Sequence, residues 1–200
     1  MRDAPRRPAT VRSDARKKGY LMAILKVANL GNPVLRIPSE PVKNIQAPEI
    51  QRLIDDMVET MREYHGVGLA APQVHRSLQI VTIEAEPDGR ASSAPPASPT
   101  ILINPRIVPA TERLEEDWEG CLSIPDLRGK VPRYTDIEVQ AHDRRGKPLD
   151  FTAHDFFARV IQHEYDHLIG TTFLDRMKSL ETLTFLEEYS RYWARHEDEE

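Results

Sequence analysis

Apolar positions near the start of the chain recur with the period of a helix. Between residues 47 and 66 they form one stripe, which consists of Ile50, Leu53, Ile54, Met57, Met61 and Tyr64. This spacing predicts an amphipathic helix. Pro48 suits the first helical position and Gly66 would end the helix, so we predict an N-proximal helix over this segment.

Four later segments have the pattern of strands. Residues 78–85 and 100–108 are rich in β-branched side chains, which favour extended backbone. Residues 136–143 and 148–153 alternate apolar and polar positions around an Asp-Arg-Arg-Gly turn, so we predict a β-hairpin there. Between the first two strands, residues 86–99 carry turn-forming and low-complexity sequence, which predicts a mobile loop.

Two further helices complete the expected architecture. One is predicted from Asp155 to about His167, with Gly170 as its stop signal. The other is an amphipathic helix near the C-terminus, whose apolar positions are Leu180, Leu183, Leu186, Tyr189 and Trp193. We therefore predict an α+β fold, in which mixed or antiparallel strands pack around a central helix, with an N-proximal and a C-terminal helix beside them.

Composition divides the chain into three parts. With 200 residues and 40% hydrophobic content, the chain suits one well-cored domain. Residues 1–21 hold seven basic residues against two acidic ones and show no apolar period, which predicts a disordered basic tail. We expect the domain that carries the chemistry over residues 22–178, and the C-terminal amphipathic helix with an acidic end over residues 179–200.

Charge and cysteine content exclude some classes of function. The formal net charge of −5 gives no basic balance that would point to DNA. No apolar run approaches the length of a membrane span or of a secretory signal. The single cysteine, Cys121, cannot form an internal disulfide, which is typical of a reducing cytoplasm. We therefore expect a cytoplasmic protein that binds neither DNA nor membrane.

The sequence QHEYDH at residues 162–167 suggests a metal site. The predicted central helix would align four side chains on one face, namely Phe156, Val160, His163 and His167. Two imidazoles one turn apart can bind the same metal ion. Glu164 lies beside that face, where it could exchange a proton with a water at the metal. Ordinary core histidines are the alternative, so the identity of a third ligand matters.

The identity of the third metal ligand distinguishes the families of metalloprotein that this motif allows. The metzincin pattern is followed as far as Gly170 but needs a histidine where this chain has Phe173. Other zincin peptidases use a downstream carboxylate, and the candidates here are Glu181, Glu187 and Glu188. They lie in an acidic amphipathic segment, where a solvated helix face explains them equally well. Cys121 is a strong donor, and one Cys with two His leaves one tetrahedral position open. Its alternative role is that of a small buried hydrophobe.

Three stretches together resemble the signature motifs of the peptide deformylases. In chain order they are GVGLAAPQ (66–73), EGCLS (119–123) and QHEYDH (162–167). The resemblance also includes ILKVANLGNPVLRIPSEPV and IPDLRGKVPRY, and it spans roughly Met22 to Met177. It implies an enzyme that removes the formyl group from the N-terminal formylmethionine of newly made polypeptides and releases formate.

The resemblance also implies the metal ligands and the catalytic groups. Cys121, His163 and His167 would hold one divalent metal ion, Fe²⁺ in the cell, although Zn²⁺, Ni²⁺ and Co²⁺ suit the same ligands. Glu164 would act as general base and then as general acid. The side-chain amide of Gln73 and the backbone N–H of Leu122 would donate hydrogen bonds to the oxyanion.

The expected substrate-binding residues are Val67, Gly68, Glu119, Phe156 and Val160. A peptide could add a strand beside Val67 and Gly68, which gives affinity independent of sequence. Val67, Phe156 and Val160 are our candidates for an apolar methionine pocket, with plain core packing as the alternative for each. Glu119 is expected either to support a metal ligand or to touch the substrate.

The expected partners are N-formylmethionyl nascent peptides, with transient proximity to the ribosome. Residues 181–200 hold seven acidic side chains against two arginines, so this end would repel ribosomal RNA and is not expected to dock there. Two competing functions remain, a zincin-type metallopeptidase and a non-catalytic metal- or peptide-binding module. Phe173 and the other two matched motifs count against the first, and the open fourth metal position counts against the second.

Overall fold

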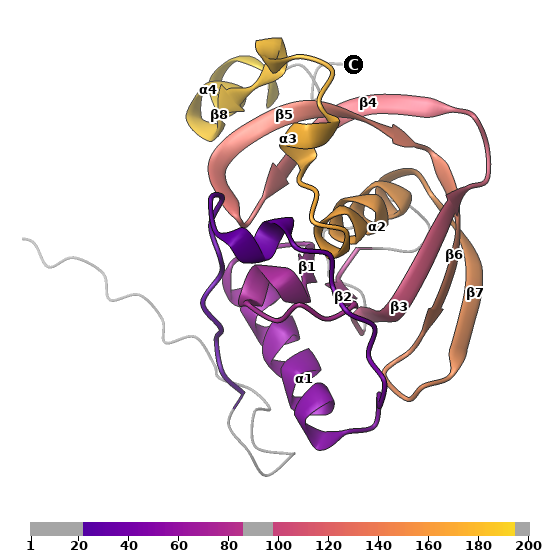
Figure 1. The fold of residues 1–200 in the computed structure, drawn as a ribbon. Coiled ribbons are helices and arrows are strands. Elements are labelled where there is room, and N and C mark those ends of the chain that lie inside the picture. The colour runs from indigo at the N-terminus through magenta and orange to yellow at the C-terminus, as the bar shows by residue number, and fades with distance from the viewer. Residues whose placement is uncertain (1–21, 86–97, 195–200) are drawn as a thin grey trace, which may run out of the picture.

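The computed structural model describes residues 22–85 and 98–194. The tail predicted over residues 1–21, most of the loop predicted over residues 86–99, and the last six residues lie outside this description. In Figure 1 helix α2 (Asp155–Leu168) lies between a larger sheet and a second, strongly curved sheet. No helix in the described ranges is long and apolar enough to cross a membrane.

The larger sheet contains five antiparallel strands in the order β1-β2-β3-β6-β7. They are β1 (Gly68–Ala70), β2 (Ile80–Ile83), β3 (Thr100–Pro109), β6 (Asp136–His142) and β7 (Pro148–His154). The predicted β6–β7 hairpin is confirmed, and Asp143 Oδ1 closes its turn by accepting hydrogen bonds from the amides of Arg145 and Lys147, each 2.8 Å long.

The second sheet was not expected from the sequence. Strands β4 (Leu114–Cys121) and β5 (Ile124–Tyr134) form a hairpin, and the short strand β8 (Thr184–Phe185) pairs with β5. β4 is acidic and mostly exposed at its start, and β5 contains two prolines, so neither strand shows clean apolar alternation. Cross-strand pairing and contacts with α2 hold this hairpin in place, which a local pattern does not reveal.

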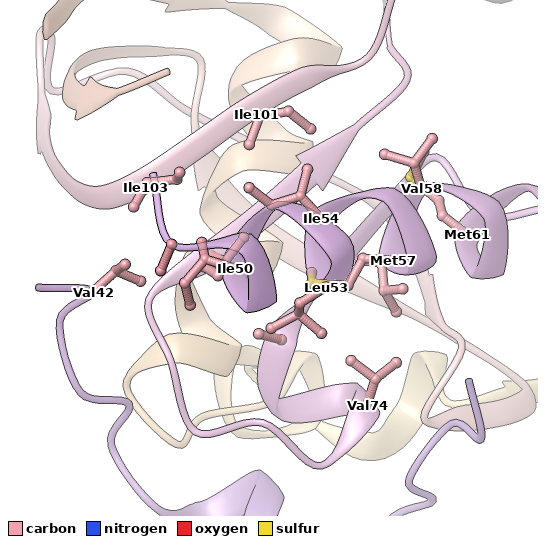
Figure 2. Close-up of a cluster of buried hydrophobic side chains, with 14 residues drawn as sticks. Val42, Ile50, Leu53, Ile54, Met57, Val58, Met61, Val74, Ile101 and Ile103 are labelled. Atoms are coloured by element: carbon pink, nitrogen blue, oxygen red, sulfur yellow. The ribbon is translucent and has the colours of Figure 1, made fainter. Parts of the chain in front are cut away.

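Helix α1 (Pro48–Glu63) confirms the predicted N-proximal helix. Its apolar stripe is buried except for Tyr64, which follows the last helical residue. Figure 2 shows the inner face of α1 against β3, where Ile50 and Ile54 lie near Ile101 and Ile103. Each fully buried side chain of this size contributes about 1.5–3 kcal/mol of apolar transfer free energy, so this cluster anchors α1 to the larger sheet.

The central helix is confirmed with the predicted start and end. α2 packs Phe157, Ala158, Ile161 and Leu168 against the larger sheet, so little of the helix is exposed. Gly170 follows its C-terminus with φ +76°, and a Cβ there would lie 2.8 Å from the backbone of Arg36. Only glycine combines this left-handed conformation with such a close backbone contact.

The predicted C-terminal helix is present as the short helix α4 (Leu186–Tyr192), and the part of the prediction that falls on residues 195–200 lies outside the described residues. Before α4, the expected helical pattern gives way to the 3₁₀ turn η3 (Leu180–Thr182) and the strand β8. Thr182 Oγ1 accepts a hydrogen bond from the amide of Lys130 at 3.1 Å, and β8 pairs with β5. These tertiary contacts override the local helical pattern. The remaining helical turns are η1 (Pro33–Arg36), η2 (Ala71–Val74) and α3 (Phe173–Arg176).

Candidate metal centre and active-site cavity

Three potential metal ligands converge in the interior. Cys121 ends β4, while His163 and His167 lie one turn apart on α2. One ligand atom from each lies within 4.8 Å of the other two, and all three side chains are buried. The Cys121 Sγ atom lies 3.2 Å from His167 Nε2. The structure thus brings the cysteine of one sheet to the histidine pair predicted from sequence.

The cysteine and the histidines of this cluster shift one another's pKa strongly. Burial raises the pKa of the Cys121 thiol, but His167 and His163 outweigh burial and leave that pKa well below its ordinary value. Burial lowers the pKa of His163, but Cys121 and Glu119 outweigh it and raise that pKa well above the ordinary value. A thiolate beside two imidazoles is the donor set that zinc and ferrous iron accept. The donor types therefore fit a divalent transition metal, whose binding would displace the proton from the imidazole nitrogen that it takes.

Glu119 supports His163 from behind. Its Oε2 atom lies 2.9 Å from His163 Nδ1, which leaves Nε2 of that ring to face the cluster. The same carboxylate accepts hydrogen bonds from Arg133 at 2.9 and 3.0 Å and from Arg159 at 3.0 Å. Glu119 also lines the cavity described below, and its carboxylate is buried and engaged behind the histidine, so of its two expected roles the geometry favours support of His163, while contact with a substrate stays a prediction.

The two buried arginines were missed by sequence reasoning. Arg133 also donates to Asp166 at 2.6 Å, and Arg159 donates to the carbonyl oxygens of Val131 and Glu115, each at 2.8 Å. Burial lowers the pKa of Arg133, but Glu119 and Asp166 outweigh burial and raise it. The only signal in the sequence was the spacing of Arg159, four positions before the first ligand histidine.

Phe173 stacks on the same histidine. The centroids of the Phe173 and His163 rings lie 6.3 Å apart, with an angle of 20° between the ring planes. Phe173 is 1% exposed. The position that a metzincin would use for a ligand therefore packs here against a ligand and shields it from solvent.

Glu164 lies beside the cluster in a space that Gly68 leaves open. A Cβ at residue 68 would lie 2.9 Å from Glu164 Cδ and closer still to its Oε1 atom. The Oε2 atom is buried and has no hydrogen-bond partner among the described residues. Burial raises the pKa of Glu164 to about 7, and the neighbouring His163 and His167 oppose that shift. Such a carboxyl group can both accept and return a proton near neutral pH.

Gln73 is fixed with its amide nitrogen toward the cysteine. Its Oε1 atom accepts a hydrogen bond from the amide of Ala70 at 2.8 Å, which settles the orientation of the side chain. Its Nε2 atom donates to Cys121 Sγ at 3.5 Å and to Ser123 Oγ at 3.2 Å. Leu122, the other expected oxyanion donor, follows Cys121 directly in the turn between β4 and β5.

A cavity of roughly 750 Å³ opens over these groups. Val67, Phe156 and Val160 all line it, as do Gly68 and Leu122. Val67 is 45% and Phe156 44% exposed, so neither is a core residue, whereas Val160 also belongs to the core of the larger sheet. β1 is the edge strand of that sheet, so the backbone near Gly68 borders the cavity with one free edge.

Comparison with known proteins gives one family. The sequence model of the polypeptide deformylase family matches residues 24–183. Peptide deformylase 2 of a Nostoc species is 46% identical over 162 residues, which cover 80% of this chain and 90% of the relative. Peptide deformylase 1 of Bordetella pertussis is 46% identical over 165 residues, which cover 82% of this chain and 92% of the relative.

Solved structures agree with the sequence comparison. A Met-Ala-Ser-bound class I type b peptide deformylase from Acinetobacter baumannii has a TM-score of 0.72 at 34% identity and covers 78% of this chain and 100% of its own. A peptide deformylase from Synechococcus elongatus in complex with actinonin has a TM-score of 0.71 at 37% identity, and covers 86% of this chain and 87% of its own. The resemblance inferred from the three motifs is thereby confirmed.

Proposed function

This chain belongs to the polypeptide deformylase family, and we propose that the residues gathered at its cavity remove the formyl group from the N-terminal formylmethionine of new polypeptides. The observation that carries the proposal is the cluster of Cys121, His163 and His167 with Glu164 beside it, at the bottom of a peptide-sized cavity. In this reaction water cleaves the bond between the formyl carbon and the N-terminal nitrogen, which releases formate and a free amine, and the family's activity is this metal-dependent hydrolysis.

We infer that Cys121, His163 and His167 hold one divalent metal, and that α2 is the metal-binding helix. When bound, the metal supplies a Lewis acid that polarises the formyl oxygen and makes a water molecule more acidic. We propose Fe²⁺ as the metal in the cell on the strength of the family resemblance, since one thiolate and two imidazoles suit Zn²⁺, Ni²⁺ and Co²⁺ equally well. Activity would then be sensitive to oxygen, through the iron and through the Cys121 thiolate.

Glu164 is proposed as the group that moves the proton. Its carboxylate takes a proton from the attacking water as the new C–O bond forms at the formyl carbon. It then gives that proton to the amine nitrogen as the C–N bond breaks, which releases formate and a free methionine N-terminus. Burial and the absence of a hydrogen-bond partner among the described residues leave Glu164 Oε2 available for this transfer.

Gln73 and Leu122 are proposed to stabilise the negative oxygen of the tetrahedral intermediate. The Gln73 amide is already turned toward Cys121 by the hydrogen bond from Ala70, so little reorganisation is needed. Preorganised donors of this kind are worth about 2.7–4 kcal/mol each in related hydrolytic sites.

The peptide is proposed to lie along β1 as an added strand, with its methionine side chain against Val67, Phe156 and Val160. Main-chain pairing gives affinity for any sequence, while the apolar wall selects methionine. Nascent chains are the natural source of such a substrate, so we infer that the protein acts in the cytoplasm near ribosomes. Docking is not proposed through residues 179–200, and truncation after Lys178 should leave co-sedimentation with ribosomes unchanged.

The proposal is tested by formate release from formyl-Met-Ala-Ser by anaerobically prepared protein loaded with Fe²⁺. We expect turnover by the unmodified protein and its loss in Glu164→Ala, with metal content unchanged in both. Peptide-bond cleavage without formate release would instead support a zincin-type metallopeptidase. Stoichiometric metal without either reaction would support the non-catalytic binding module.

A further inference from the structure

Arg159 lies on α2 one turn before His163, on the side of the helix that meets the second sheet. It is buried, with 7% of the residue exposed. A guanidinium group carries five N–H donors in a fixed fork, so one buried arginine can bind several acceptors at once. In the view of Figure 1 α2 lies below the β4–β5 hairpin, and Arg159 donates to the backbone of both hairpin strands.

The backbone contacts of Arg159 attach α2 to this hairpin. Its Nη2 atom donates to the carbonyl oxygen of Glu115 at 2.8 Å. Its Nη1 atom donates to the carbonyl oxygen of Val131 at 2.8 Å and to that of Asp117 at 3.4 Å. In the described part of the chain β4 is an edge strand that pairs with β5 alone. Arg159 therefore adds a restraint on β4 that the sheet itself does not supply.

A fourth contact joins the same arginine to a ligand histidine. Nη1 of Arg159 also donates to Glu119 Oε1 at 3.0 Å, and the Oε2 atom of that carboxylate lies 2.9 Å from His163 Nδ1. Glu119 lies on β4, two residues before Cys121. Arg159 thus contacts both the strand that supplies the cysteine and the carboxylate that orients a histidine.

The ladder of the hairpin does not by itself fix the position of Cys121. Pairing of β4 with β5 is regular from Leu114 to Glu119, and its register shifts between Glu119 and Cys121. An irregularity of this kind bends a strand and redirects a side chain. Metal ions of the zinc type need their ligand atoms at about 2.0–2.3 Å. The strand before the irregularity must therefore be held firmly if Cys121 is to meet the same ion as two histidines.

A second arginine holds the hairpin at another point along α2. Arg133 of β5 donates to Asp166 at 2.6 Å, and Asp166 follows His163 by three positions on the helix. The hairpin is therefore fixed to α2 on both sides of His163, by Arg159 before it and by Asp166 after it. Of the two arginines, Arg159 is the one whose side chain binds the backbone of β4 in the described structure. The strand that ends in Cys121 therefore depends on Arg159.

We propose that Arg159 is a positioning residue, which holds the end of β4 against α2 so that Cys121 and the two histidines can contact one metal ion. This inference rests on the metal site of the proposed function. It assigns Arg159 no contact with the substrate, although the residue also borders the cavity. A role in peptide binding would raise KM and leave metal affinity unchanged, whereas a positioning role changes the binding of the metal itself.

The test titrates metal-free protein with Co²⁺ under anaerobic conditions, in competition with a chelator of known affinity. Absorption by charge transfer from the thiolate to Co²⁺ reports the bond to Cys121, and its intensity per bound ion counts only metal-loaded protein. Arg159→Lys keeps the positive charge but replaces the planar fork by a single ammonium group. We expect this variant to bind Co²⁺ about tenfold more weakly and to show an altered thiolate band.

Arg144→Lys is the matched control. Arg144 also makes several contacts, with Asp55 at 2.9 Å and with Gln51 at 3.0 and 3.2 Å, but these tie the β6–β7 turn to α1. This variant should lower the free energy of unfolding and leave Co²⁺ affinity and the thiolate band unchanged. Arg159→Gln, which is shorter and has two donors, should weaken Co²⁺ binding at least as much as Arg159→Lys.

A double variant separates the two routes by which Arg159 could act. If Arg159 acted only through the Glu119 carboxylate, Arg159→Lys would not change Co²⁺ affinity in a Glu119→Gln background. The carbonyl contacts with β4 do not pass through that carboxylate. We therefore expect a further loss of Co²⁺ affinity, and a further change of the thiolate band, when both substitutions are combined.

The positioning role is overturned if both Arg159 variants keep the Co²⁺ affinity and the thiolate band of the unmodified chain. It is equally overturned if Arg144→Lys changes them as much, or if the double variant binds Co²⁺ as well as Glu119→Gln alone. A raised KM for formyl-Met-Ala-Ser with unchanged Co²⁺ binding would assign Arg159 to the peptide and also overturn it. Absence of a thiolate band from the unmodified chain at full Co²⁺ occupancy would instead overturn the metal site of the proposed function.

Discussion

At the scale of single residues, Glu119 links the candidate metal site to the rest of the fold. A buried carboxylate is costly unless it is paired. Here Arg133, Arg159 and His163 all contact the carboxylate. Burial raises the pKa of Glu119, but His163 and Arg133 outweigh burial. The pKa of Glu119 therefore lies well below its ordinary value. The carboxylate thus stays charged and fixes the ring of one ligand. Its role is to position, since it contacts the ligand and not the reacting atoms.

Glu119→Gln should weaken metal binding by about 10–100-fold, because the amide holds the His163 ring less firmly and leaves two buried arginines undercompensated. Competition with a chelator of known affinity measures the change. Glu116→Gln is the matched control on the same strand, since Glu116 forms only a surface ion pair with Lys178 at 3.2 Å. Equal metal affinity in Glu119→Gln and the unmodified chain would refute the positioning role.

Gly68→Ala should lower kcat by about 100-fold while metal content is retained. The new Cβ would overlap the Glu164 carboxylate, and a displacement of about 1 Å at a catalytic group costs that much. Gly66→Ala is the comparison variant, because the nearest contacts of a Cβ there are the Leu122 side chain at 2.8 Å and the Gly68 carbonyl oxygen at 3.3 Å, and not Glu164. Steady-state formate release gives kcat for both variants, and metal analysis gives their metal content. An unaffected kcat in Gly68→Ala would contradict the proposed position and role of the Glu164 carboxylate.

At the scale of elements, surface ion pairs tie distant segments together. Arg36 in η1 is paired with Asp175 in α3, far away in the sequence. The amide and hydroxyl of Thr172 donate to Asp175 Oδ2 at 2.7 and 2.8 Å. Burial raises the pKa of Asp175, but Arg36 and Thr172 outweigh burial and lower it from the ordinary 3.8. The ionised form of Asp175 is therefore the one that stabilises the fold.

Asp175→Asn should lower the free energy of unfolding at pH 7 by less than about 1 kcal/mol, because both partners are partly exposed and screened. The pKa of Asp175 is lower in the folded chain, so its contribution is fully present well above pH 3.8 and is lost as pH falls through the folded value. Urea denaturation of both proteins from pH 7 down to pH 3.5 checks this. If the difference in free energy of unfolding between the two proteins grew as the pH falls, it would contradict the stabilising role of ionised Asp175.

The elements also differ in how far local pattern determines them. α1 and α2 were predicted because each carries an apolar stripe and a clear stop signal, Gly66 or Gly170. The β4–β5 hairpin was missed, because its strands are acidic or contain proline and are held by pairing across the chain. The C-terminal helix α4 begins later than expected, since residues 184–185 pair with β5 and that pairing outweighs local propensity.

The residues of the candidate site also differ in whether the sequence predicts them. Cys121, His163 and His167 were predicted because their motifs are contiguous and their order along the chain is distinctive. Arg133 and Arg159 were not, because a buried arginine looks like a surface arginine until its carboxylate partner is placed beside it. Leu186 fits a helical stripe equally well whether it faces a core or a cavity, so only the fold distinguishes the two.

At the scale of the whole molecule, the site exists only when both sheets are in place. Cys121 comes from the second sheet, Gln73 and Gly68 border the larger one, and the histidines lie on the helix between them. Figure 1 shows α2 enclosed in this way. A metal ion that binds Cys121 of β4 and the two histidines of α2, which folding brings together, stabilises the native state over the unfolded one.

Removal of the metal should therefore lower the free energy of unfolding. Metal at a hundred times its dissociation constant should add about 2.7 kcal/mol, measured by denaturant titration of the metal-free and metal-loaded protein under anaerobic conditions. In Cys121→Ser the difference should shrink, because the strongest donor of the three is lost. Equal stability with and without metal in the unmodified chain, at metal concentrations that give full occupancy, would show that the metal does not prefer the folded chain and would contradict a site that folding assembles.

The central claim is that one metal held by Cys121, His163 and His167 enables hydrolysis of the formyl group. The most direct measurement is an anaerobic titration of metal-free protein with Fe²⁺, followed by formate release from formyl-Met-Ala-Ser at each step. The account predicts activity that rises in proportion to added metal and reaches its plateau at one equivalent per chain. Formate release that is independent of metal, or no release once one equivalent is bound, would contradict it.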